Sequence, residues 1–479
     1  MKINKCRICN SSKLVNLFSL GKLCFTGKFP SKKQIIKKEP VKLILCKNCQ
    51  LVQLAHNFNL KYLYGPDYGY RTGINKTMLN HVKNITKILS KKMTLKKNDI
   101  VLDIASNDGS LLNFYKKDII TFGIDPILKK YKKNYKNINY SLPNFFSASK
   151  VRGITKEKFK IITALSVFYD AKNPNKFILD VKKILDKDGI FLLEFADLSS
   201  IIKLKMFDTI CHEHLEYYSS KVICDLTKKH NLRVFDIKQN DINGGSKQYL
   251  ICHNNSKIKS NTKKIVKVLK IEKKQKLDKV ITYKNFIKHI NKSKSQLYKK
   301  LVHLKNNHKT IHCYGASTKG NVLLQYYNID YKLIDYAAER NKNKYGYYTP
   351  GSKIKIVSEK YSRSLNPDYF LVLPWHFRRE ILKREMKTRK KARIRTSKEK
   401  HGLSKIASFT TKSITTAISN YKKNKEQNKI KAIKLHKLEE RNSLLKEKKD
   451  LKIWEDKLNK ENNKLKANED EIKLKEKEI

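Results

Sequence analysis

The chain has 479 residues, of which 40% are hydrophobic, so it can form two or three domains with a sizeable core. It has no run of 18 or more apolar residues, and its first residues lack the apolar segment of a signal peptide, so we expect a cytoplasmic protein without a membrane partner. The formal net charge is +63, but only 13 of the 106 basic residues are Arg, on which nucleic-acid readout depends strongly. The charge therefore indicates a lysine-coated surface and disfavours a nucleic acid as partner.

Two cysteine pairs stand within residues 1–60. Cys6 and Cys9, then Cys46 and Cys49, form two C-x2-C motifs with 36 residues between them. Two residues between thiolates allow both sulfurs to bind one tetrahedral Zn²⁺, and four thiolates leave no open position for catalysis. We therefore predict a small domain held together by a structural zinc ion; buried or redox-active thiols are the alternative.

Residues 61–255 open with an aromatic, glycine-containing segment that includes Tyr68 and Tyr70, followed by a helical pattern. From residue 96, apolar runs alternate with amphipathic segments, which indicates an α/β fold with a parallel sheet and crossover helices. The runs that predict strands are Ile100–Ile104, Ile119–Ile124, Ile161–Leu165 and Ile190–Phe195.

A turn of small and polar residues follows the first of these strands, and Asp125 closes the second. Ligands of open α/β sheets bind beyond the carboxyl ends of the strands, and an acidic residue there suits the two hydroxyls of a ribose. An ordinary strand–turn–helix is the alternative. The segment resembles the nucleoside-binding half of class I methyltransferases, which implies S-adenosylmethionine as cofactor. The cofactor-binding residues so implied are Asp103, Ser106, Asn107, Asp108, Gly109, Asp125, Ser166 and Phe168.

The segment His212-Glu213-His214 follows the fourth predicted strand. Histidine is the side chain best matched to proton transfer near neutral pH. On a strand, the two histidine rings would point to one face. A metal site and plain packing are alternatives, but the position of the segment, where a substrate would meet the methyl donor, favours catalysis.

The remainder of the chain divides into three stretches. Residues 256–306 are Lys-rich and predict a connecting helix, whereas residues 307–385 restart the α/β pattern and predict a second Rossmann-like domain. Its strands are expected at Thr310–Tyr314, Lys332–Tyr336 and Tyr369–Leu373. Residues 386–479 are rich in Lys, Glu and Asn, and an apolar residue recurs at every seventh position from 444 to 479. This pattern predicts a Lys-rich helical tail with the periodicity of a coiled coil.

Eight sequence blocks stand in an order that resembles the nucleotide-sugar C-methyltransferases. They are the four cysteines and residues 68–73, 102–112, 211–219, 243–246, 314–321, 350–352 and 373–377. The resemblance covers residues 5–385. It implies a zinc-binding domain, a class I methyltransferase core and a Rossmann-like C-terminal domain, with a keto-sugar on a nucleoside diphosphate held between the last two.

The same resemblance implies roles for individual residues. His214 would be the general base that forms an enolate, supported by Glu213 and His212, and Tyr68 or Tyr70 would reach the sugar. Position 211 is Cys where some relatives have Tyr. The substrate-binding residues implied are Gly244, Gly245, Ser246, Gly315, Ser317, Lys319 and Asn321, with Lys319 placed to meet the diphosphate. A nucleic-acid methyltransferase and a non-catalytic scaffold are the competing hypotheses.

Overall fold

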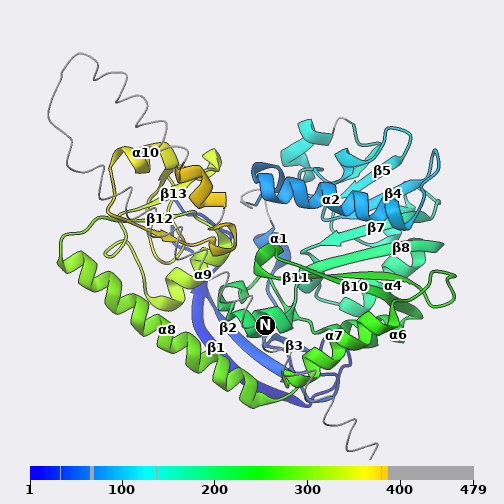
Figure 1. The fold of residues 1–479 in the computed structure, drawn as a ribbon, viewed down its shortest axis with the longest axis horizontal. Helices are drawn as coiled ribbons and strands as arrows, with labels where there is room; N and C mark the ends of the chain where they lie inside the picture. Colours follow the sequence, from blue (N-terminus) through cyan, green and yellow to red (C-terminus); the bar gives the residue numbers. More distant parts are fainter. Residues whose placement is uncertain (33, 65–69, 136, 379, 387–479) are drawn as a thin grey trace, which may run out of the picture. The chain divides into compact units, whose positions relative to one another are not determined.

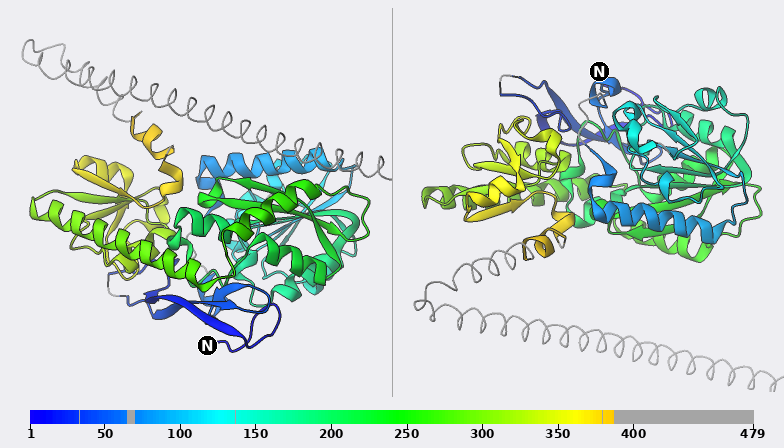
Figure 2. Two further views of the ribbon diagram at one scale, coloured as in Figure 1. Left: turned by 60° about the horizontal axis from the view of Figure 1, so that its bottom comes forward. Right: turned by 90° about the horizontal axis from the view of Figure 1, so that it is seen from above.

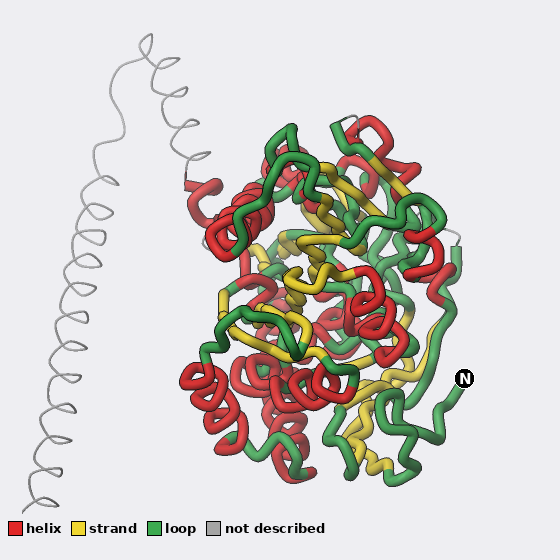
Figure 3. Tube along the Cα trace, turned by 90° about the vertical axis from the view of Figure 1, so that its right-hand side faces the viewer, coloured by secondary structure: helices red, strands yellow, loops and turns green. Residues whose placement is uncertain are grey.

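The computed structural model describes residues 1–386 except 33, 65–69, 136 and 379. In this part, the chain forms three sheets, of four, seven and four strands (Figure 1). Figure 3 shows the strands lying inside, with helices packed around them. The predicted helical tail and its heptad pattern fall on residues beyond 386, outside the described residues.

The N-terminal sheet is antiparallel and has the order β1-β2-β3-β9. Its strands are β1 (Leu14–Cys24), β2 (Lys38–Cys46), β3 (Val52–Leu54) and β9 (Glu216–Tyr217). The last strand comes from far along the chain, because Val52 pairs with Tyr217 and Gln53 with Glu216. This sheet therefore contains a strand from the segment just after the predicted catalytic histidine.

The seven-stranded sheet has the order β10-β11-β8-β7-β4-β5-β6. The five strands from β8 to β6 are parallel, as predicted, and β11 runs antiparallel to both of its neighbours, β8 and β10. The strand β11 departs from the parallel arrangement, because the short connection 241–245 between β10 and β11 leaves no room for a crossover helix. The strands are β4 (Ile100–Ile104), β5 (Ile120–Ile124), β6 (Tyr140–Leu142), β7 (Phe159–Leu165), β8 (Leu185–Ala196), β10 (Leu232–Asn240) and β11 (Ser246–His253).

Helices cover both faces of this sheet, since its central strands are buried on both sides. Val101 and Ile161 belong to the same hydrophobic cluster as α2 (Lys76–Lys92), whereas Leu102 and Ile162 belong to the cluster of α4 and α6. The α2 helix begins at the cap Asn75, whose side chain accepts a hydrogen bond from the Thr77 N–H. The other helices here are α3 (Ala148–Arg152), α4 (Pro174–Ile184), α5 (Leu198–Leu204) and α6 (Ser220–Lys229).

The C-terminal sheet is parallel and has the order β14-β13-β12-β15. Its elements are β12 (Ile311–Tyr314), α9 (Thr318–Tyr327), β13 (Tyr336–Glu339), β14 (Ile356–Ser358), α10 (Glu359–Ser364) and β15 (Tyr369–Val372). The strand predicted at 332–336 begins only at Tyr336, as β13. The residues before it form a turn, in which the Asp330 carbonyl accepts hydrogen bonds from the N–H groups of Leu333 and Ile334. The three-residue strand β14 was not predicted.

The predicted connecting helix is two helices, α7 (Thr262–Lys274) and α8 (Val280–Asn306). The α8 helix buries one apolar stripe, and Phe286 in it lies 5.7 Å, ring centroid to ring centroid, from Phe18 of β1. Figure 2 shows α8 running beside the C-terminal sheet. Short helices complete the described part: α1 (Leu60–Leu63) and the 3-10 turns at Thr72–Ile74, Leu112–Phe114, Leu128–Tyr135, Phe168–Asp170, Phe207–Thr209, Ile242–Gly244, Lys342–Lys344 and Trp375–Phe377. None of the described helices is long and apolar enough to cross a membrane.

Candidate active site

A cavity of about 600 Å³ lies beyond the carboxyl ends of β4, β5 and β7 and is also lined by residues that follow β12 and β13. Parallel strands of the seven-stranded and the C-terminal sheet thus present their carboxyl ends to one space, where ligands of such sheets bind. Of the residues predicted from the sequence, the cavity brings together Tyr70, Asp103, Ser106, Asn107, Asp125, Ser166, Glu213, His214, Gly315, Ser317 and Lys319.

Other predicted residues lie outside the lining of this cavity, and Tyr68 lies outside the described residues. Those outside the lining are Asp108, Gly109, Phe168, His212, Gly244, Gly245, Ser246 and Asn321. Each has a packing or hydrogen-bonding role in the structure. The Phe168 ring stacks on Tyr218 with 4.9 Å between centroids, Asp108 accepts hydrogen bonds from Arg71 and from the Gly73 N–H, and the Asn321 amide donates to the Thr26 carbonyl.

The turn after β4 has three residues with positive φ, Ala105, Asn107 and Gly109. This backbone turns the Asn107 N–H toward Asp125, whose Oδ2 accepts it at 2.9 Å while Oδ1 accepts the Ile127 N–H at 2.8 Å. Two backbone donors therefore fix the carboxylate of Asp125, and each oxygen retains a lone pair for a ligand. Burial raises the pKa of Asp125, so hydrogen-bond donors from a ligand would stabilise its charge.

Asp103 ends β4 beside this carboxylate. Its side chain is 4% exposed, and Oδ1 accepts a hydrogen bond from Thr163 Oγ1 at 2.6 Å. Burial, with a smaller contribution from the charge of Asp125, raises the pKa of Asp103 to about 7. A cationic ligand group would reverse that shift, because an opposite charge favours the ionised carboxyl.

His214 lies on a turn before β9, and its ring centroid is 4.1 Å from that of Tyr169. The Nδ1 atom donates to the Thr209 carbonyl at 2.7 Å, since a carbonyl oxygen can only accept. Burial lowers the pKa of His214 to about 3, so the ring is neutral and its Nε2 carries no proton. The structure thus presents a free imidazole lone pair at the cavity, which is the form required of a general base.

Glu213 and His212 are held by the N-terminal part of the chain. The Glu213 carboxylate accepts hydrogen bonds from the hydroxyl of Thr26, at 3.2 and 3.3 Å, and from the Gly27 N–H at 3.1 Å. The His212 ring lies between Phe25 and Phe58 and donates to the Glu39 carbonyl. The segment is a turn and not a strand, so the condition under which both histidine rings would point to one face is not met.

Lysines line the side of the cavity formed by the C-terminal sheet. Lys319, in the first turn of α9, donates from Nζ to the Asn243 carbonyl at 2.8 Å, and burial lowers its pKa. Lys344 donates to the Ala316 carbonyl at 2.8 Å. Glu339 closes β13 and accepts the N–H groups of Ala316 and Asn341, which is the arrangement of Asp125 at the end of β5.

Sequence reasoning missed several lining residues, namely Tyr64, His81, Asp170, Glu194, Glu339 and Lys344. His81 of α2 and Glu194 of β8 form an ion pair at 2.7 Å across 113 residues of chain. Tyr64 donates to Asp170 at 2.6 Å. Asp170, Glu194 and Glu339 had a sequence signal, since each lies at, or within five residues after, the carboxyl end of a predicted strand.

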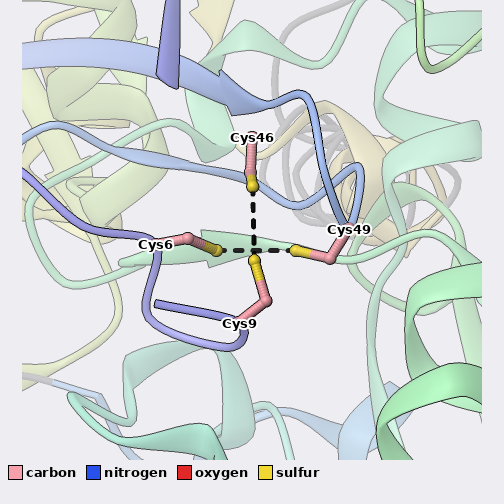
Figure 4. A group of neighbouring side chains, drawn as sticks. All are labelled: Cys6, Cys9, Cys46 and Cys49. Atoms are coloured by element: carbon pink, nitrogen blue, oxygen red, sulfur yellow. Dashed lines mark hydrogen bonds between the residues drawn. The ribbon is translucent and has the colours of Figure 1, made fainter. Parts of the chain in front are cut away.

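The four predicted zinc ligands come together at the end of the N-terminal sheet where β1 begins and β2 ends (Figure 4). The sulfur atoms of Cys6, Cys9, Cys46 and Cys49 all lie within 4.8 Å of one another, and Cys6–Cys49 and Cys9–Cys46 are each 3.5 Å apart. Four sulfurs bound to one tetrahedral Zn²⁺ at about 2.3 Å have separations close to these. The arrangement therefore fits a structural zinc ion.

Three family models match consecutive parts of the chain: a zinc binding domain at residues 6–64, a methyltransferase domain at 76–237 and a C-methyltransferase C-terminal domain at 241–394. The chain is 25% identical to the C-methyltransferase NovU of Streptomyces niveus over 389 residues, which covers 80% of this chain and 92% of NovU. Among solved structures, an S-adenosylmethionine-dependent methyltransferase from Clostridium acetobutylicum ATCC 824 matches 37% of this chain and 92% of its own, at 15% identity and a TM-score of 0.31. The magnesium protoporphyrin IX methyltransferase ChlM of Synechocystis PCC 6803 matches 37% of this chain and 88% of its own, at 12% identity and a TM-score of 0.30.

Proposed function

Because this chain is an S-adenosylmethionine-dependent C-methyltransferase with an N-terminal zinc-binding domain and a C-terminal C-methyltransferase domain, we propose that it methylates a carbon next to the ketone of a sugar carried on a nucleoside diphosphate. The observation that carries the proposal is the neutral, oriented ring of His214 in the cavity. Two sheets line this cavity with the carboxyl ends of their parallel strands. S-adenosylmethionine supplies an electrophilic methyl group on a sulfonium.

The turn after β4 and the end of β5 fit that cofactor. Asp125 would accept hydrogen bonds from the ribose hydroxyls, because its oxygens are already oriented by backbone donors. Asp103 would face the amino-acid part, whose ammonium group suits a buried carboxyl with few partners of its own. Ser106, Asn107 and Ser166 line the same region.

His214 would remove the proton from the carbon next to the ketone. Its Nε2 accepts the proton while Nδ1–H stays bound to the Thr209 carbonyl, which keeps the ring from rotating. Glu213 acts through orientation, since its carboxylate is bound to Thr26 and Gly27 and fixes the backbone beside the base. Bound cofactor and acceptor would displace water from this part of the cavity, and water would otherwise protonate the carbanion.

The diphosphate would lie against the C-terminal sheet. Lys319 and Lys344 bring positive charge to that wall, and Lys319 stands in the first turn of α9, where backbone N–H groups and the helix dipole favour an anion. Glu339 would accept hydrogen bonds from the ribose of the substrate nucleotide, by analogy with Asp125. The methyl donor and the acceptor would then enter one cavity from two sheets.

The test measures transfer of a radiolabelled methyl group from S-adenosylmethionine to a panel of uridine, thymidine, guanosine and cytidine diphosphate 4-keto-sugars. We expect one member of the panel to be methylated on carbon, and His214→Ala to lower kcat at least about 100-fold, which is the usual contribution of a general base. His289→Ala, at an exposed position on α8, is the matched control and should keep full activity. Equal kcat in the His214 variant and the wild type would reject the base assignment.

A further inference from the structure

The polypeptide beside His214 carries a carboxyl group that the base-assisted mechanism does not use. Asp170 ends the 3-10 turn Phe168–Asp170 and lines the cavity together with His214. The Leu215 N–H donates to the Tyr169 carbonyl at 2.7 Å, which ties the two segments together. Asp170 and His214 therefore lie in neighbouring segments of the cavity wall.

The surroundings of Asp170 keep its carboxyl group neutral. The side chain is 8% exposed, its Oδ2 accepts the Tyr64 hydroxyl at 2.6 Å, and its Oδ1 is buried without a hydrogen-bond partner among the described residues. Burial raises the pKa of Asp170 well above that of an ordinary aspartate, and the nearby charge of Glu213 raises it further. In a neutral carboxyl whose Oδ2 accepts a hydrogen bond, the proton of the carboxyl group itself is carried by Oδ1.

We propose that Asp170 donates this hydrogen bond to the carbonyl oxygen of the acceptor and stabilises the oxyanion of the enolate. The proposal rests on the proposed function, because only a ketone next to the methylated carbon needs such a donor. A phenol at position 211 cannot serve, since that residue is a buried Cys outside the lining of the cavity. The unpartnered Oδ1 would gain its missing partner when the acceptor binds.

Enolate formation moves one proton, methyl transfer moves one methyl group, and both steps shift electron pairs. The C–H proton moves to His214 Nε2, and the electron pair of that bond forms the C=C bond of the enolate while the carbonyl oxygen takes the negative charge. Asp170 keeps its proton and shares it in a hydrogen bond to this oxygen. When the new C–CH₃ bond forms, the C=O bond is restored, the departing sulfur keeps the electron pair of the broken S–CH₃ bond, and the proton on His214 passes to solvent.

The two replacements Asp170→Leu and Asp170→Asn separate this role from others. Leu has no donor, so we expect kcat to fall about 100-fold, the usual effect of removing one oxyanion donor, with little change in KM. Asn keeps an N–H donor, so kcat should fall less than in the Leu variant. If Asp170 were an ionised base, Asn and Leu would be equally damaging. Asp236→Asn, which removes a buried carboxyl of β10 outside the cavity lining, is the control.

A second readout does not depend on the folding of the Leu variant. Wild-type kcat should fall at high pH as Asp170 ionises, and Asp170→Asn should lack that limb. Tyr64→Phe removes the hydrogen bond that lowers the pKa of Asp170, so its limb should move to higher pH. Equal kcat values and equal pH profiles in all variants would overturn the role of Asp170 and leave the proposed function intact. A wild type that methylates no keto-sugar of the panel would overturn both.

Discussion

Burial, with a smaller contribution from the charge of Lys319, keeps His214 in the form that a general base requires. An exposed histidine has a pKa near 6.5 and is substantially protonated at neutral pH, whereas burial lowers the pKa of His214 to about 3. The cost is that a buried imidazolium is unstable. An enolate oxyanion beside the ring would offset that cost, so proton removal and oxyanion formation are coupled in this cavity.

The pH dependence of methyl transfer should reflect this lowered pKa. His214 must be deprotonated to act, and with a folded-state pKa of about 3 it stays deprotonated throughout the neutral range. We expect kcat/KM for the acceptor, measured with saturating S-adenosylmethionine, to be flat between about pH 5 and 7. This range includes the ordinary histidine pKa near 6.5, at which a solvated histidine base would give an acid limb. Saturation keeps the ionisation of Asp103 out of the profile. A limb near pH 6.5 would show that the ring is solvated in the working enzyme.

Single residues could be predicted where local sequence determines position. Asp103 and Asp125 lie at the carboxyl ends of two predicted strands. Ligands of open α/β sheets bind at these ends, so the sequence was enough to predict that both residues line one site. Tyr64 and His81 could not be predicted, because their partners Asp170 and Glu194 are more than 100 residues away. The glycines at 244 and 245 were expected at the substrate, yet a Cβ on Gly244 would lie 2.7 Å from Trp375, so close packing explains Gly244.

At the scale of elements, the turn that carries His214 is fixed mainly by the N-terminal part of the chain. Leu54 donates its N–H to the Leu215 carbonyl at 2.8 Å, β3 pairs with β9, and Glu213 accepts hydrogen bonds from Thr26 and Gly27. Arg7, inside the first cysteine pair, donates to the Leu54 carbonyl and forms an ion pair with Glu216 at 3.4 Å. The zinc-binding domain is therefore a support for the turn that carries His214.

Removal of zinc should consequently reduce catalysis more than cofactor binding. Structural zinc supplies folding free energy to its domain, and loss of supporting contacts around a site typically lowers activity about tenfold or more. We expect Cys9→Ser to lose zinc, measured with a chromogenic chelator, and to lower methyl transfer at least about tenfold. Calorimetric affinity for S-adenosylmethionine should change far less. Cys224→Ser, at a thiol outside the zinc group, is the control; equal activity in the two variants would contradict the supporting role.

The elements themselves were predictable where apolar periodicity is strong. The strands at 100–104, 161–165 and 369–373 were predicted within two residues of β4, β7 and β15. β9 and β14 were not, because two or three residues carry no periodic signal and their pairing depends on distant partners. The break between α7 and α8 was also missed, since Lys-rich sequence runs on through it.

At the scale of the whole molecule, residues 1–386 form one compact unit whose C-terminal end is tied down. Glu385 accepts hydrogen bonds from Arg363, and the Trp375 indole donates to Asp208 at 3.0 Å. Trp375 thus ties the segment after β15 to the methyltransferase domain, and Glu385 is held by Arg363 of α10.

Truncation should locate the boundary of the functional unit. A chain ending at residue 386 keeps all of these contacts, so we expect its melting temperature and methyl transfer to match those of the full chain. A chain ending at residue 374 loses Trp375 and the charged hydrogen bonds of Glu385, and its melting temperature should fall by several degrees. Differential scanning fluorimetry measures both. A large fall for the longer fragment would show that residues beyond 386 contribute to stability.

The pairing of β3 with β9 also dictates an order of events during synthesis. β3 leaves the ribosome roughly 160 residues before β9, which corresponds to about ten seconds or more of translation at the usual rates. During that interval the cysteines can already bind zinc, but the edge of β3 stays open to unwanted partners. The nascent chain must keep this edge free until β9 arrives, so the turn that carries His214 cannot be fixed in place before most of the methyltransferase domain has been made.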